Sequence, residues 1–200
     1  MPAPTLIYLH GFRSSPQSKK AQLFVQAVDA LPDATRPRIH VPNLQHDPAL
    51  AVAGVAAWIE REVGDAAASA LTLVGSSLGG YYATYLAERF NARAVLINPA
   101  IRPYDDLKPY IGTQANLYSG EEFEVTDNHF GELVVLKVPR ITRPARYFLL
   151  VRSDDELLDW REAVAFYGGA WQYVEGGGDH GWEDFDGEVR SILRFAGCVA

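Results

Sequence analysis

The chain has 200 residues, enough for one domain with a substantial hydrophobic core. Apolar residues make up 48% and charged residues 22%, which is typical of a globular protein and excludes a disordered chain. The net charge is −7 and the Lys and Arg residues form no basic cluster, so nucleic acid and anionic membranes are poor candidates as partners. We expect residues 1–200 to form a single domain.

Cysteine usage and hydrophobic segments indicate a cytoplasmic protein. Cys198 is the one cysteine, so neither an intrachain disulfide nor a cysteine-based metal cluster is possible. The apolar run in MPAPTLIYLHGF is too short for the core of a signal peptide. The later segment AVAGVAAWI is too short to span a bilayer, so no membrane association is expected.

Short apolar runs alternate along the chain with segments of helical spacing. The runs predict strands at 5–10, 38–44, 70–75, 93–99, 146–152 and 171–176. Their near-continuous apolarity is typical of strands buried on both faces of a parallel sheet. Apolar spacing and capping signals predict helices ending near Leu31 and over 48–63, 78–90, 159–167 and 185–196. The alternation predicts an α/β fold, a mainly parallel sheet of about six strands with helices on both faces.

The start of the first helix and the segment 101–145 need separate description. The first helix is expected to follow Ser14 and Ser15 as a cap, with Pro16 in its first turn. The segment 101–145 mixes aromatic and polar residues, and its LVVLKV run fits either a strand or a helix. A segment of this length between two sheet strands is either a lid or pocket wall, or a helical crossover with a long loop.

The motif GSSLG, residues 75–79, matches the pattern G-x-S-x-G with Ser77 at its centre. A predicted strand precedes the motif and a predicted helix follows it. Such a sharp turn exposes the central hydroxyl, and glycines flank it because neighbouring backbone comes close. The helix N-terminus favours developing negative charge. We interpret Ser77 as a nucleophile; the alternative is a tight turn without chemistry.

A serine nucleophile requires a base and an acid that orients it, in the chain order Ser, acid, His. His129 and His180 follow Ser77, and His180 lies in the glycine-rich VEGGGDHGW between the last strand and the last helix. A loop there can carry an imidazole to the carboxyl edge of the sheet, so His180 is the predicted base. Asp154 and Asp155 both follow the preceding strand, and the pattern does not choose between them.

An oxyanion hole requires two backbone N–H donors. One is expected from Leu78, directly after the nucleophile. The other is expected from Phe12, in the loop after the first strand. His10 in that loop is interpreted as structural. His10, Asp179 and His180 do not have the spacing of a metal site, so we expect neither a metal nor a cofactor.

These motifs resemble a known family. HGFRSSPQSKKA, GSSLGGYYATYLAERF, INPAIRPYDDL, SDDELLDWREAVAFY and EGGGDHGW are together similar to the YqiA/YcfP-type esterases, the UPF0227 group of the α/β-hydrolase superfamily. The resemblance covers nearly the whole chain. It implies a compact α/β-hydrolase that cleaves short-chain carboxylic esters without a cofactor. The family's serine falls on Ser77, its histidine on His180 and its H-G-F loop on 10–12.

The resemblance also implies an acid. The family pattern G-D-E-x-L-D reads Asp-Asp-Glu-Leu-Leu-Asp at 154–159, which places the acid on Asp155. Asp154 replaces the usual glycine. Asp179 stands where the family often has asparagine, and a carboxylate there could share the role of the acid.

The expected function is hydrolysis of a small-molecule acyl ester by a Ser77–His180–Asp155 triad through an acyl-enzyme. A thioesterase would use the same groups. A protein of a different class, which binds a small acyl ligand on a hydrolase scaffold without turnover, is the other alternative. Aromatic residues between Tyr104 and Phe130, together with Trp182, either line the pocket or belong to the core. None of these patterns specifies an oligomeric state.

Overall fold

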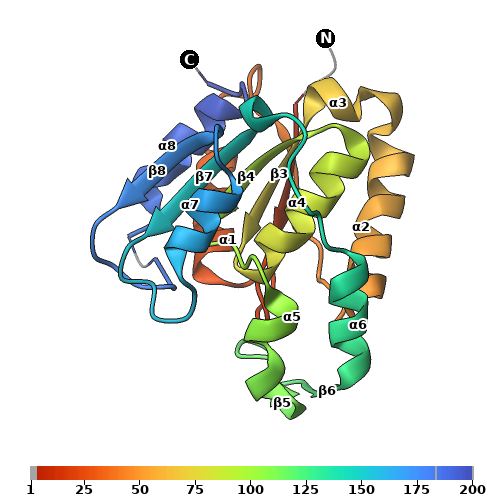
Figure 1. Cartoon of the computed structure of the whole chain (residues 1–200). Coiled ribbons are helices and arrows are strands. Elements are labelled where there is room, and N and C mark those ends of the chain that lie inside the picture. Colours follow the sequence, from red (N-terminus) through yellow and green to blue (C-terminus); the bar gives the residue numbers. More distant parts are fainter. Residues whose placement is uncertain (1–3, 183, 200) are drawn as a thin grey trace.

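The computed structural model of the chain describes residues 4–182 and 184–199. Its centre is a six-stranded sheet in which every pairing is parallel (Figure 1). The spatial order is β2-β1-β3-β4-β7-β8. The strands are β1 (Thr5–Leu9), β2 (Arg38–His40), β3 (Leu71–Ser76), β4 (Arg93–Ile97), β7 (Tyr147–Arg152) and β8 (Trp171–Glu175). The predicted α/β fold is therefore confirmed.

Helices cover both faces of this sheet. One face packs against α1 and α8, and the other packs against α2, α4 and α7, while α6 adjoins α2 and α5. The helices are α1 (Lys19–Asp29), α2 (Pro48–Glu62), α3 (Ala67–Ala70), α4 (Leu78–Phe90), α5 (Pro103–Asp106), α6 (Asp127–Val135), α7 (Trp160–Phe166) and α8 (Asp186–Phe195), and the 3₁₀ turns are η1 (Gly64–Ala66), η2 (Lys108–Tyr110) and η3 (Pro144–Arg146). The predicted helix over 78–90 matches α4 residue for residue.

Two expected boundaries were wrong. The first helix begins at Lys19, because the hydroxyl of Ser15 accepts a hydrogen bond from Gln17 N and its carbonyl accepts one from Ser18 N. These bonds form a separate turn before α1, so Pro16 lies outside the helix. The second strand ends at His40 rather than at residue 44, and Pro42 has no N–H with which to continue the pairing.

The last strand also departs from the expectation that every strand is buried on both faces. Strand β8 is exposed along most of its length, and the side chain of Trp171 retains 67% of its accessible surface. Its place in the sheet explains this exposure. β8 is an edge strand that pairs with β7 alone, so apolar residues in it did not indicate burial.

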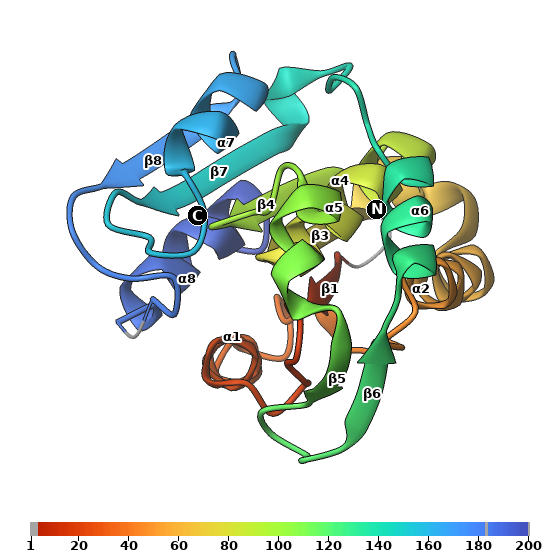
Figure 2. The ribbon, with the colours of Figure 1, turned by 60° about the horizontal axis from the view of Figure 1, so that its bottom comes forward.

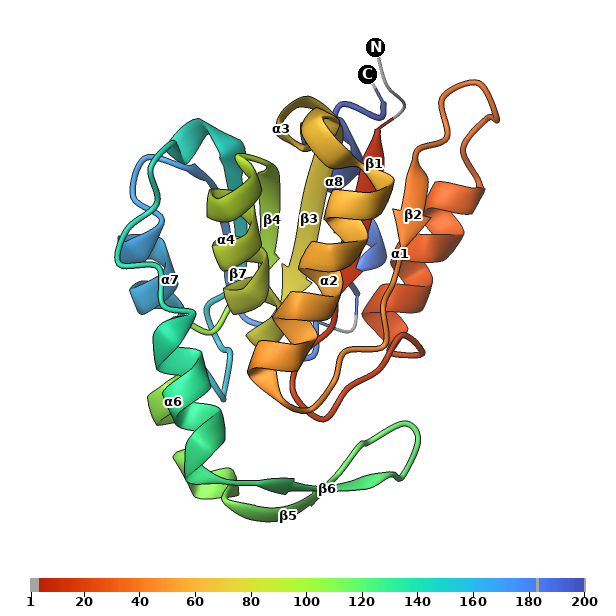
Figure 3. The same cartoon turned by 90° about the vertical axis from the view of Figure 1, so that its right-hand side faces the viewer.

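The segment between β4 and β7 forms a second, smaller layer at the carboxyl ends of the sheet strands. It contains α5, the antiparallel hairpin of β5 (Gly112–Ala115) and β6 (Glu122–Val125), and α6. Figure 2 shows α5 and this hairpin in front of the strand ends, and Figure 3 shows the hairpin extending beyond the sheet. The LVVLKV run begins in a helix, since α6 continues to Val135.

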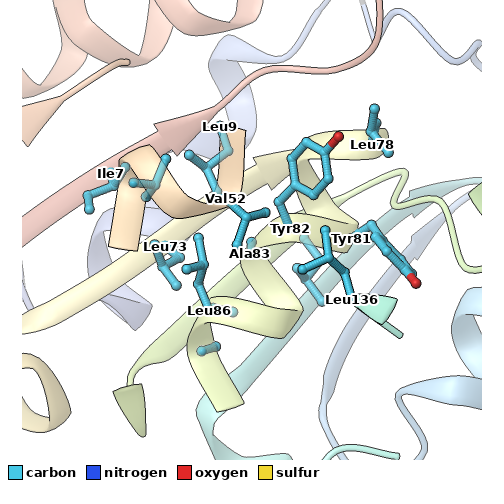
Figure 4. Packing of buried hydrophobic residues seen from close by; sticks show 14 of the residues in the cluster. Ile7, Leu9, Val52, Leu73, Leu78, Tyr81, Tyr82, Ala83, Leu86 and Leu136 are labelled. Carbon is cyan, nitrogen blue, oxygen red and sulfur yellow. The ribbon is translucent and has the colours of Figure 1, made fainter. Parts of the chain in front are cut away.

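Side chains alternate across the central strands to build the core. On β1, Leu6 and Tyr8 pack on the side of α1 and α8, while Ile7 and Leu9 pack on the side of α2 and α4. This alternation follows from the two-residue period of a strand. Figure 4 shows the second side, with the residues Ile7, Leu9, Val52, Leu73, Leu78, Tyr81, Tyr82, Ala83, Leu86 and Leu136 labelled.

The start of α4 packs unusually close to the sheet. A Cβ atom added at Gly79 would lie 2.0 Å from the carbonyl oxygen of Leu9 in β1. A Cβ atom added at Gly75 would lie 2.3 Å from the carbonyl oxygen of Gly79. Both distances are far below van der Waals contact, so these positions accept glycine alone. This close backbone approach confirms the reason expected for the two glycines of the motif.

The packing predicts opposite effects for two Gly→Ala substitutions in helices. Gly79→Ala should lower the free energy of unfolding by more than about 3 kcal/mol, because the new methyl group meets rigid backbone. Gly54→Ala in α2 should raise it by about 0.5–1 kcal/mol, because alanine favours a helix interior. A Cβ at Gly54 meets no atom within 4 Å. Urea unfolding measures both, and equal values for the two variants would contradict the packing argument.

Candidate active site

Ser77 occupies the single residue between β3 and α4, with φ 56° and ψ −123°. This conformation is strained for any residue with a side chain. Hydrogen bonds to neighbouring backbone maintain it. Ser77 N donates to Ile97 O at 3.0 Å, and Ser77 O accepts from Gly80 N at 2.9 Å and from Ala100 N at 3.1 Å. The turn is therefore locked to the end of β4.

The loop after β1 packs directly against this serine. A Cβ atom added at Gly11 would lie 3.1 Å from Ser77 Cβ and 3.5 Å from Ser77 Oγ. The next residue is Phe12, and the first residue of α4 is Leu78. In residues 4–182 and 184–199, neither the Phe12 N–H nor the Leu78 N–H has a hydrogen-bond acceptor. These are the two residues expected to supply the oxyanion donors, and both line a cavity that Ser77 also lines.

His10 is buried at the base of the same loop. Its Nδ1 lies 3.1 Å from Gly11 O, and its Nε2 accepts a hydrogen bond from Leu44 N at 3.3 Å. Burial lowers the pKa of His10, which favours a neutral imidazole. With both ring nitrogens engaged, His10 joins the loop after β1 to the chain after β2.

The imidazole of His180 pairs with Asp155. His180 Nδ1 lies 2.8 Å from Asp155 Oδ2, and the Asp155 side chain is 2% exposed. The second oxygen of Asp155 accepts hydrogen bonds from the backbone N–H groups of Leu157 and Leu158, both at 2.9 Å. These bonds hold the carboxylate in place, and the remaining ring nitrogen of His180 is Nε2.

The other two candidate acids have different partners. Asp154 accepts a hydrogen bond from Ser153 Oγ, and Asp179 accepts one from Trp182 N at 2.6 Å. Ser77 and His180 line the same cavity, but no hydrogen bond joins Ser77 Oγ to His180 within the described part of the chain. The structure thus brings Asp155 and His180 into contact, and Ser77 lines the cavity that His180 also lines.

Residues that the sequence did not identify hold the backbone of His180. Its N–H donates to Glu156 Oε2 at 2.9 Å, and its carbonyl accepts from Lys20 Nζ at 3.1 Å and from Asn98 Nδ2 at 3.3 Å. Burial lowers the pKa of Lys20 to about 8. Lys20 is 160 residues from His180, so no local pattern could reveal this contact.

The glycine-rich loop before His180 packs on a buried arginine. The guanidinium of Arg152 lies over the ring of Trp182 at 4.5 Å and pairs with Glu175 at 3.2 Å. A Cβ atom added at Gly178 would lie 2.7 Å from Arg152 Cδ, and Gly178 has φ +77°. Gly178 therefore serves this close contact, whereas a Cβ atom added at Gly176 or Gly177 would meet no atom within 4 Å. Trp182 is 1% exposed and belongs to the core rather than to the cavity lining.

Ser77 opens into a cavity of about 470 Å³. The cavity extends between the loop after β1, the loops that carry Asp155 and His180, and the segment after β4. Its lining includes Phe12, Leu78, Leu107, Tyr110, Leu117 and Tyr118. The hairpin that supplies Leu117 is tied to the loop after β1, since Arg13 Nε donates to Ala115 O and Asn116 Nδ2 donates to Ser14 O. Part of the 101–145 segment is therefore a wall of this cavity.

Among the residues that the structure describes, no group of three or more His, Cys, Asp and Glu side chains is arranged to hold a metal ion. None of the described helices is long and apolar enough to cross a membrane.

The arrangement of sheet and helices is that of the α/β-hydrolase fold. The chain is similar over 97% of its length to 88% of an Agrobacterium vitis S4 protein provisionally assigned as a hydrolase, with a TM-score of 0.76 and 20% identity. It is similar over 96% of its length to 85% of the esterase domain of a Rhodothermus marinus protein, with a TM-score of 0.68 and 16% identity. A third similar structure is Est1E from Butyrivibrio proteoclasticus with bound ferulic acid, which has a TM-score of 0.64, 14% identity and coverage of 96% and 88%.

The family is established by the sequence itself. The chain belongs to UPF0227, described as an uncharacterised protein family, whose model matches residues 5–197.

The strained turn leads to a prediction about stability. Ser77→Gly and Ser77→Ala both remove the hydroxyl, but only glycine relieves the conformation with φ 56°. Ser77→Gly should therefore unfold with a free energy about 1 kcal/mol higher than Ser77→Ala. Equilibrium urea denaturation of the two variants measures the difference. A higher stability for Ser77→Ala would mean that the turn is not strained.

Proposed function

We propose that the protein is a serine hydrolase that cleaves carboxylic acyl esters through a Ser77–His180–Asp155 triad. One observation carries the proposal. A serine held at a strained strand-to-helix turn opens into the same cavity as a histidine whose Nδ1 is paired with a buried carboxylate. Ser77, Asp155 and His180 follow one another in the order nucleophile, acid, base, which is the chain order of α/β-hydrolases. The described loops that carry them all lie at the carboxyl edge of the sheet, where such folds bind ligands.

The mechanism follows from the roles of these groups. Ser77 Oγ attacks the ester carbonyl while His180 Nε2 takes its proton, and Asp155 stabilises the imidazolium. The N–H groups of Phe12 and Leu78 bind the oxyanion, and the start of α4 adds a favourable dipole. The proton on His180 passes to the leaving alcohol. Water activated by His180 then attacks the acyl-enzyme and releases the acid. The Ser77–His180 hydrogen bond forms when substrate binds, since such contacts are often long without ligand.

The cavity supports a small-molecule substrate with an apolar group. Its volume of about 470 Å³ lies within the range of sites for small molecules. Leu107, Tyr110 and Leu117 supply apolar surface near Ser77. A structural relative with bound ferulic acid, and another that is an esterase domain, agree with an ester substrate. Thioesters would react with the same groups and are the nearest variant. A non-catalytic role does not account for the pairing of His180 with Asp155.

Hydrolysis of a series of p-nitrophenyl esters, from acetate to octanoate, tests the nucleophile. We expect turnover with a chain-length optimum in the native protein, and a loss of at least about 10³-fold in kcat for Ser77→Ala. Equal rates for the two proteins would refute Ser77 as nucleophile. If neither protein cleaves these esters, acyl thioesters are assayed next, and inactivity there too would favour the ligand-binding alternative.

A matched pair of substitutions tests the acid. Asp155→Ala should lower kcat by about 10²–10⁴-fold, because the imidazole loses the group that fixes its tautomer. Asp154→Ala removes a neighbouring exposed carboxylate and should leave kcat within about twofold of the native value. Steady-state kinetics on the best ester measure both. A larger loss for Asp154→Ala than for Asp155→Ala would reverse the assignment.

A further inference from the structure

The two peptide groups that flank His180 are each held by a charged side chain. Glu156 accepts the N–H of His180, and Lys20 donates to the His180 carbonyl together with Asn98. The three partners come from different parts of the fold. Glu156 follows β7, Lys20 lies in the first turn of α1, and Asn98 follows β4. The backbone of His180, on an irregular loop, is thus anchored to three separate parts of the fold.

The loop needs such anchors. It connects the exposed edge strand β8 to α8, and both Gly177 and Gly178 have positive φ. Glycines and an exposed edge give little resistance to local movement. The bond to Asp155 orients the ring of His180, but it does not prevent the ring from moving with its loop. Proton transfer requires the imidazole to stay within hydrogen-bond reach of the serine.

From this geometry we propose that Lys20 and Glu156, of opposite charge, form a clamp on the backbone of His180 that positions its imidazole for catalysis. Both are positioning residues, because they act through His180. The Glu156 carboxylate accepts from the N–H of the peptide group before His180, and the Lys20 ammonium donates to the carbonyl of the peptide group after it. Both hydrogen bonds are charge-assisted. The role in catalysis rests on the proposed esterase function.

The desolvated charge of Lys20 lowers the stability of the folded protein, which supports a functional role for this residue. Burial lowers its pKa to about 8, against the attraction of Asp155, Glu156 and Asp179. The folded protein therefore binds fewer protons than the unfolded chain between pH 8 and the ordinary range of lysine. In this interval stability rises with pH, and below it the full cost of the buried ammonium is present. A methionine of similar shape would avoid that cost.

The first test compares Lys20→Met with the native protein on the best p-nitrophenyl ester. Lys20 also lines the cavity, and methionine is of similar shape. We therefore expect kcat to fall by about tenfold because the base is misplaced, with KM unchanged within about twofold. The midpoint of thermal unfolding at pH 7 should be equal or higher, as the buried charge is gone. Lys137→Met, at an exposed site on the chain after α6, is the control and should retain native kinetics.

Replacing Lys20 by arginine and varying the pH distinguish a positioning role of Lys20 from a role in packing alone. Lys20→Arg keeps a permanent cation that can donate to a carbonyl, and it should recover kcat to within about threefold. Native kcat should decline above pH 8 as Lys20 loses its charge, and Lys20→Arg should abolish this decline. The charges that face Lys20 are Asp155, Glu156 and Asp179, and the cavity also contains Arg13, Lys19 and Asp106.

The second half of the clamp is tested at Glu156. Glu156→Gln retains an oxygen that accepts the His180 N–H and should keep most activity, whereas Glu156→Ala should lose about three- to tenfold in kcat. Because both residues hold the backbone of His180, Lys20→Met combined with Glu156→Ala should lose less than the product of the single losses. Fully multiplicative losses would overturn the clamp.

Amide hydrogen exchange gives a readout that does not need turnover. In Lys20→Met the His180 N–H should exchange at least about tenfold faster than in the native protein, as measured by NMR. Unchanged exchange, native kcat in Lys20→Met, or a change confined to KM would each refute the clamp. If activity depends on Ser77 but not on Lys20, the clamp alone fails. If Ser77 is dispensable, the proposed function fails and the exchange rate still decides the clamp.

Discussion

The contact between the first turn of α4 and the end of β1 is the constraint on which the rest of the site depends. Gly79 lies against the Leu9 carbonyl so closely that a methyl group would be 2.0 Å from the oxygen. With the helix pressed onto the sheet, the chain has one residue in which to leave β3 and enter α4. Ser77 takes that place with φ 56°, and its hydroxyl faces the cavity. Because of the same turn, the N–H of Leu78 at the start of α4 has no backbone acceptor among the described residues.

The serine and the histidine are held in different ways. Ser77 is fixed by backbone bonds between two central strands of the sheet and the start of α4. His180 lies on a loop beyond an exposed edge strand, and side chains hold it instead. Asp155 holds the ring of His180, and Lys20 and Glu156 hold its backbone carbonyl and N–H. Central strands are rigid because they are paired on both sides and buried, whereas an edge loop depends on the contacts made to it.

The segment after β4 completes the site without adding to the sheet. Its hairpin is tied to the loop after β1 by bonds from Arg13 to Ala115 O and from Asn116 to Ser14 O. The wall of the cavity and the loop that carries Phe12 are therefore one connected unit. Arg13, with its Nε donated to this contact, serves the structure of the wall. Differences in this segment would change the shape of the cavity while leaving the strained turn at Ser77 intact.

The sequence by itself determined the sheet, most helix positions and the places of Ser77 and His180, because apolar periodicity, glycine spacing and strand-to-helix turns are local properties of the chain. Local pattern left Asp154 and Asp155 equivalent. The family resemblance pointed to Asp155, and the tertiary structure places that carboxylate against His180 Nδ1. It also decided that β8 is exposed, that Trp182 is core and that Lys20 reaches the His180 carbonyl. These outcomes depend on the packing of segments far apart in sequence, and no local pattern encodes which of them become neighbours.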